Sequence, residues 1–147
     1  MNTIVPLISS GTAGPLGVLH LPRLWLKVSL EQRGLLAAGY PGIGKGYDQM
    51  VLDALGLKGD QVVNFIKTQK PTYAQFEAWV KKQPGVKLDK GTIDKLNGAI
   101  RGYIHDDGTR KGILGSNGIP DDASAPKDAV NLNNLDDWYE FHQAVLK

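Results

Sequence analysis

The stretch HLPRLWLKV, residues 20–28, decides where the first helix begins and which face it buries. Pro22 is favoured in the first turn of a helix, where its missing N–H would have no partner anyway. The apolar residues Leu21, Leu24 and Val28 recur at helical spacing. They predict a helix with one buried stripe.

The same stretch carries cations at the start of that helix. His20 and Arg23 lie where the backbone dipole is positive, and a cation there costs roughly 0.3–1 kcal/mol. With Lys27 they form an i, i+3, i+7 group on one side of the helix. In one interpretation Arg23 grips a carboxylate or phosphate while His20 exchanges protons with it. In the other, Arg23 pairs with an acid from residues 121–137 and fastens the C-terminal helix to the first.

The rest of the chain predicts further helices of similar length. Helical periodicity and turn residues mark them. They cover approximately residues 48–55, 60–69, 73–83, 89–105, 107–117 and 134–146. Expected N-caps include Asp60, Thr72 with Gln75 in a capping box, and either Asn133 or Asn134.

No stretch shows the period-two alternation of a strand, so the expected fold class is all-α. Residues 14–147 are expected to form a single compact domain of about seven short helices, with residues 1–13 as an N-terminal extension. A polar loop at 119–132 precedes the C-terminal helix. Short helices need mutual packing, which favours one shared core.

Composition excludes several classes of function. With 147 residues, 41% hydrophobic and 22% charged, the chain is typical of one globular domain. It has no cysteine, which excludes disulfides, cysteine-ligated zinc and a cysteine nucleophile. The N-terminus has neither a signal-peptide pattern nor a membrane-spanning length, so a cytoplasmic location is expected.

Charge is divided unevenly along the chain although the net charge is only +2. Residues 58–111 carry eleven Lys and Arg against six Asp and Glu, and residues 112–147 carry two against six. In the middle region the lysines alternate with acids and form no basic stripe, so no nucleic-acid partner is expected. The simplest interpretation is attraction within the fold or across a dimer.

The glycine-rich segment GYPGIGKG, residues 39–46, nearly matches a phosphate-binding loop. Gly46 stands where the motif requires a hydroxyl for magnesium, and a helix end, not a strand, precedes it. The segment is therefore a turn between helices, or a site where Lys45 and backbone N–H groups bind a smaller anion.

The three histidines have no metal-ligand spacing, so no metal site and no cofactor are expected. His142 follows Trp138 by one turn, which predicts a core histidine. His105 is expected at the end of the longest helix, either capping its last carbonyls or acting as a second proton carrier.

The segment GVLHLPR at residues 17–23, the turn Leu55-Gly56-Leu57 and the F-x-x-W-V pattern at 76–80 are similar to a bacterial domain of unknown function, family 5069. The segments GIPDD at 118–122 and NNLDDW at 133–138 resemble that family's tail. The resemblance implies a compact bacterial helical domain and no particular reaction.

These features predict a pocket for an anionic small molecule beside the first helix. Arg23, Lys27 and Lys45 are the expected ligand-binding residues, and His20 and His105 the expected proton carriers. If a reaction follows, metal-independent acid–base chemistry of the isomerase, lyase or hydrolase kind is the class these side chains allow. The alternative is a non-catalytic interaction module or homodimer subunit, which an exposed apolar patch around Trp79 or Trp138 would favour.

Overall fold

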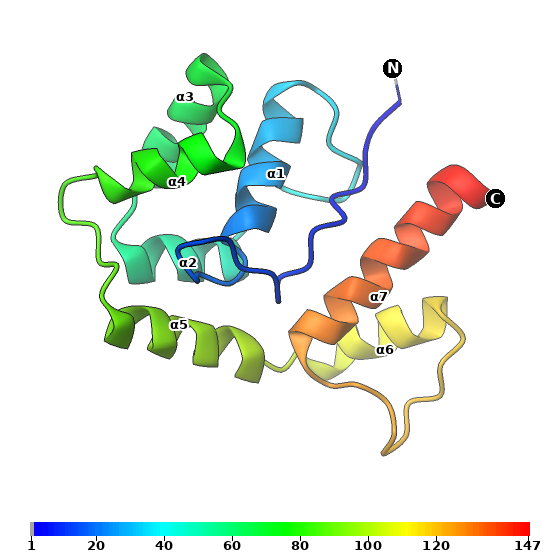
Figure 1. Cartoon of the computed structure of the whole chain (residues 1–147). Coiled ribbons are helices and arrows are strands. Elements are labelled where there is room, and N and C mark those ends of the chain that lie inside the picture. Colours follow the sequence, from blue (N-terminus) through cyan, green and yellow to red (C-terminus); the bar gives the residue numbers. More distant parts are fainter. Residues whose placement is uncertain (1) are drawn as a thin grey trace.

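The computed structural model describes residues 2–147, which form seven α-helices and a closing π-helical turn (Figure 1). The elements are α1 (Leu21–Gln32), α2 (Tyr47–Leu55), α3 (Gly59–Gln69), α4 (Tyr73–Lys81), α5 (Lys90–Gly102), α6 (Asp107–Ser116), α7 (Ala129–Phe141) and η1 (His142–Leu146). These residues contain no strand, only three isolated β-bridges. The all-α prediction is confirmed.

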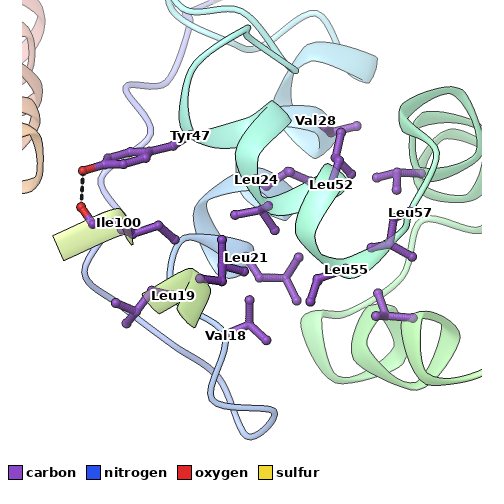
Figure 2. Close-up of a cluster of buried hydrophobic side chains, with 14 of the residues drawn as sticks. Val18, Leu19, Leu21, Leu24, Val28, Tyr47, Leu52, Leu55, Leu57 and Ile100 are labelled. Carbon is purple, nitrogen blue, oxygen red and sulfur yellow. Dashed lines mark hydrogen bonds between the residues drawn. The ribbon is translucent and has the colours of Figure 1, made fainter. Parts of the chain in front are cut away.

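The predicted stripe of α1 lies at the centre of the core. Leu21, Leu24 and Val28 are completely buried, and α2 packs its own apolar face beside them (Figure 2). Full burial of each such side chain contributes about 1.5–3 kcal/mol. The Tyr47 hydroxyl donates a hydrogen bond to the Ile100 carbonyl at 2.5 Å, which joins the start of α2 to α5 (Figure 2).

Around this centre the helices form two groups. α1 contacts α2, α3 and α4, while α6 packs on α7 and α5 contacts both α2 and α7. The N-terminal segment runs between α1 and α7 (Figure 1), with Val5, Pro6 and Ser10 buried. None of the helices within residues 2–147 combines the length and apolar character needed to cross a membrane.

Several helix ends agree with the sequence analysis. α4 begins with the complete capping box of Thr72 and Gln75. α2 ends at Gly56, whose φ of 77° is the left-handed conformation that glycine adopts without a steric penalty. At these helix ends the neighbouring residues alone were sufficient to predict the boundary.

The predicted end of the fifth helix is wrong. α5 stops at Gly102, so His105 lies in the link to α6 and caps no carbonyl. The backbone of this link pairs with the start of α7: the N–H of Ala129 donates to the Tyr103 carbonyl at 2.8 Å. That pairing draws residues 103–105 out of the helix although their apolar spacing continues it.

Two other predicted caps are also wrong. α7 begins at Ala129 with Asp128 as its cap, four or more residues before Asn133 and Asn134, which lie inside the helix. The long loop before α7 therefore covers residues 117–128. α3 begins after Lys58, and Asp60 lies in its first turn instead of capping it.

Candidate functional site

A cavity of about 320 Å³ opens between α1, the segment before α2, and α7. It is at the small end of the range for ligand pockets. Its lining includes all five residues predicted to bind a ligand or carry a proton: His20, Arg23, Lys27, Lys45 and His105. The sequence placed three of these on one helix, and the structure adds the other two from distant segments.

Arg23 forms the ion pair that the second interpretation predicted. Its Nη1 lies 2.6 Å from Oδ2 of Asp137 and its Nη2 lies 3.1 Å from Oδ1, so the contact is bidentate. Nη1 also donates to the carbonyls of Pro6 and Ile8, at 2.8 and 2.9 Å. Arg23 therefore fastens α7 and the N-terminal segment to α1, and its guanidinium is already occupied.

Tyr40 completes this contact from the glycine-rich segment. Its hydroxyl donates to Oδ1 of Asp137 at 3.0 Å, and the Arg23 guanidinium carbon lies 5.9 Å from the centre of its ring. Burial, and then the Asp137 charge, raises the pKa of Tyr40 well above its usual value. Tyr40 stays a neutral hydrogen-bond donor, and it lines the cavity beside the ion pair.

Asp48 contacts the other two residues of the predicted group, His20 and Lys27. Its Oδ1 lies 2.6 Å from Nε2 of His20, and its Oδ2 lies 2.5 Å from Nζ of Lys27 and 2.8 Å from the N–H of Gly44. Burial alone raises the pKa of this carboxyl, but the His20 hydrogen bond and the nearby charges outweigh it and hold the pKa below its ordinary value. The Lys27 cation is thus compensated inside the protein.

His20 is held at both ring nitrogens. Nε2 contacts Asp48, and Nδ1 lies 2.9 Å from the Ser10 hydroxyl. Burial lowers the pKa of His20 in spite of the Asp48 carboxylate, so the ring is neutral and donates through Nε2. Its φ of 71° is a left-handed conformation that non-glycine residues adopt at a cost. These two hydrogen bonds stabilise that conformation.

Ser10, His20 and Asp48 follow the hydrogen-bond order of a hydrolase triad, but they do not form a nucleophilic site. Ser10 is only 1% exposed and is not part of the cavity lining. The ring is also reversed relative to the usual triad, since Nδ1 contacts the Ser10 hydroxyl and Nε2 contacts the Asp48 carboxylate. The arrangement is a buried hydrogen-bond chain that positions the first turn of α1.

The inner wall of the cavity, defined here as His20, Arg23, Lys27, Asp48 and Asp137, is thus a paired set of charges. Each of these residues is 6% exposed or less. The rim is defined as Lys45, His105 and Asp136, and it differs. Neither Lys45 nor Asp136 has an ion-pair partner within 4.0 Å in residues 2–147.

Lys45 lies directly before α2, and this helix start is open. Gly46 is the N-cap, and no side chain accepts a hydrogen bond there. Gly46, Tyr47 and Asp48 line the cavity beside Lys45. The first N–H groups of a helix have no intrahelical acceptor and carry a partial positive charge. The anion-binding capacity of the cavity is therefore concentrated at this point.

The glycine-rich segment is a connection between helices and not a nucleotide loop. No strand precedes it in the part of the chain that the structure describes, since residues 33–46 link α1 directly to α2. The Gly42 N–H donates to Glu31, and the Gly44 N–H donates to Asp48. Those amides are committed to side chains of the protein itself.

His105 retains a free nitrogen. Its Nε2 donates to Oδ1 of Asn133 at 2.8 Å, and Nδ1 has no partner among residues 2–147. In the neutral ring this hydrogen bond places the proton on Nε2 and leaves a lone pair on Nδ1. His105 is half-buried in the cavity lining. It can accept a proton from a bound molecule, which His20 cannot do without losing an internal contact.

The third histidine lies elsewhere. His142 begins η1, is exposed and does not line the cavity, so the prediction of a core histidine is wrong. Within residues 2–147, no group of three or more histidine, aspartate or glutamate side chains is placed to hold a metal ion.

Sequence reasoning missed the acids of this site. The region 121–137 had been named as the source of a partner for Arg23, but nothing singled out Asp137 within it. Asp48 and Asp136 gave no signal, because pairing over long sequence separation leaves no periodic mark. No protein-family model matches the chain, and no curated protein matches it, so the resemblance to family 5069 stays a prediction.

Proposed function

We propose that this protein binds a small anionic molecule, a carboxylate or a phosphate, in the cavity between α1, α2 and α7. The observation that carries this proposal is the position of Lys45, an exposed ammonium without an ion-pair partner in the described chain, next to the uncapped start of α2. Arg23 and Lys27 do not bind the ligand in this proposal, because each is paired with an acid of the inner wall.

The proton-exchanging group of this proposal is His105. Its Nδ1 is free, whereas both nitrogens of His20 are bonded to Ser10 and Asp48. A general base must lie within hydrogen-bond reach of the proton it takes. His20 therefore has a positioning role here, holding Asp48 and the first turn of α1.

Thermal-shift measurements with acetate, succinate, citrate and inorganic phosphate test the binding proposal. A ligand at a hundred times its Kd adds about 2.7 kcal/mol to the stability of the folded state, which moves the Tm by several degrees. We expect this shift in the wild type and in Lys81→Ala, an exposed lysine of α4 outside the cavity. We expect its loss in Lys45→Ala. Equal shifts in both variants would refute the assignment.

Histidine NMR locates the ligand independently. A bound anion near His105 should move the ring resonances of His105, while His142, exposed and outside the cavity, serves as the internal control. Equal movement of both rings would indicate a general effect of the solution and no site at His105.

A second candidate function is self-association through the C-terminal helix, and one observation favours it. Trp138 is 57% exposed, and Val145 and Leu146 are exposed beyond it. Large exposed apolar side chains along one segment are typical of interaction surfaces. Sedimentation analysis over a range of concentrations tests this: a dimer that dissociates in Trp138→Gln supports it, and a monomer at every concentration refutes it.

A further inference from the structure

Two neighbouring acids of α7 differ in whether they have an ion-pair partner. Asp137 is paired with Arg23, but Asp136, half-buried in the cavity lining, has no ion-pair partner in residues 2–147. Glu140, one turn further along the helix, has the same charge, and like charges at i, i+4 are destabilising. Burial, then the charges of Glu140 and Asp137, raises the pKa of Asp136, and the charges of Arg23 and His105 offset this rise only in part. The ionised Asp136 carboxylate is therefore destabilised in the fold, and no cation lies within ion-pair distance of it in residues 2–147.

The charges around the cavity cancel except for two. Arg23 forms an ion pair with Asp137, and Lys27 forms one with Asp48. Of the charged groups in the lining, Lys45 and Asp136 are left without a partner in the described chain. They belong to different walls, the segment before α2 and the helix α7. A simple anion can pair only with Lys45, and it is repelled by the Asp136 carboxylate in the same cavity. A simple cation can pair only with Asp136, and it is repelled by the Lys45 ammonium.

We propose that the ligand is a small zwitterion of the amino-acid class, with its acid group at Lys45 and the open start of α2 and its ammonium group at Asp136. This inference rests on the proposed function, because it uses the same cavity and the same anion position. It adds the second contact and thereby names the ligand class. A hydrogen bond between charged groups strengthens binding by about tenfold or more.

A series of ω-amino acids provides the test. Glycine, β-alanine, γ-aminobutyrate, δ-aminovalerate and ε-aminocaproate carry the same two groups at increasing separation. Each is compared by isothermal titration with the alkanoate of equal carbon number, which lacks only the ammonium group. At least one amino acid of the series should bind about tenfold tighter than its alkanoate.

Two variants assign that preference to one carboxyl. In Asp136→Asn the advantage of the amino acid should disappear, while alkanoate binding is kept or improved. Glu140→Gln is the matched control: it removes a half-buried acid from the same helix but outside the cavity lining, and it should keep the advantage. A preference that survives in Asp136→Asn, or is lost in Glu140→Gln alone, overturns the proposal.

The outcomes separate this inference from the proposed function. Binding of alkanoates and phosphate without any preference for amino acids refutes the zwitterion and leaves the anion site in place. Absence of binding by alkanoates, phosphate and amino acids alike refutes both. Amino-acid binding that depends on Asp136 and on Lys45 supports both.

Discussion

The inner wall and the rim of the cavity contain the same kinds of charged side chain, but within the described part of the chain those of the wall are paired and those of the rim are not. On the inner wall Arg23 and Asp137, and Lys27 with His20 and Asp48, are buried and paired. On the rim Lys45 and Asp136 have no ion-pair partner in residues 2–147. A buried charge must be paired because its lost hydration costs several kcal/mol, whereas a charge that water reaches can stay free. The wall therefore explains stability, and the rim is where ligand binding is to be sought.

The largest effect is expected at Arg23. Arg23→Ala leaves Asp137 buried without its cation and removes donors from two carbonyls, so the free energy of unfolding should fall by about 3–5 kcal/mol. Urea denaturation measures this. Arg33→Ala, an exposed arginine at the end of α1, is the control and should change stability by no more than about 0.5 kcal/mol.

A companion variant tests the cause of that loss. Arg23→Met combined with Asp137→Leu removes both charges together, and it should be markedly more stable than Arg23→Ala because no lone carboxylate remains. If the double variant is as unstable as the single one, the pairing is not what makes Arg23 important.

The next effect is a dependence of stability on pH. The pKa of His20 lies below its ordinary value of 6.5, so below pH 6.5 the unfolded chain takes up a proton that the folded protein refuses. The free energy of unfolding should therefore fall as the pH drops from 6.5, by at most about 1.4 kcal/mol per pH unit. Below pH 3.8 the lowered pKa of Asp48 adds to the loss.

Denaturation curves between pH 8 and pH 5 test this dependence. His20→Asn removes the titrating ring, and asparagine tolerates the left-handed backbone at this position. Its curve should be flatter than that of the wild type. A wild-type slope retained in His20→Asn would assign the effect to another group.

A smaller effect of opposite sign is expected at the rim. Asp136→Asn should stabilise the protein at pH 7 by about 0.5 kcal/mol, because it removes a half-buried charge next to Glu140 and Asp137. The raised pKa means that stability is lost as the carboxyl deprotonates with rising pH, so the gain should shrink as the pH falls and should be absent below pH 3.8. A less stable variant at pH 7 would show that Asp136 has a favourable contact within the protein.

The smallest effect is expected at Lys45. Lys45→Ala removes no internal contact of the ammonium and should change the free energy of unfolding by no more than about 0.5 kcal/mol. Lys90→Ala breaks the exposed pair of Lys90 with Asp94 on α5 and sets the scale for a surface ion pair, also about 0.5 kcal/mol at most. If Lys45→Ala loses much more stability than Lys90→Ala, Lys45 makes an internal contact and belongs with the paired residues of the inner wall.

Local features of the fold were predictable, and long-range ones were not. The stripe of α1, the Thr72–Gln75 capping box and the helix end at residue 55 depend on neighbouring residues, and each is observed. The prediction of where α7 begins was wrong because Asp128, Asn131, Asn133 and Asn134 are all acceptable caps. Asp128 becomes the cap because residues 103–105 pair with residues 127–129.

The site shows the same division. The spacing of His20, Arg23 and Lys27 predicted three side chains on one side of a helix, and all three line the cavity. It did not reveal that all three already have partners within the protein, because Asp48 and Asp137 come from other parts of the chain. The predicted end of the helix at His105 failed for the same reason as the start of α7.

The contact between Arg23 and Asp137 also bears on how the protein folds. These residues are 114 positions apart in the chain, so their meeting closes a loop that includes most of the protein. Closing so long a loop costs entropy, and contacts of this range form late unless nearer ones shorten the path. The α1–α2 core is local by comparison and can form first. During synthesis the cavity can form only after α7 has been made and has docked, because Asp136 and Asp137 of that helix are part of its lining.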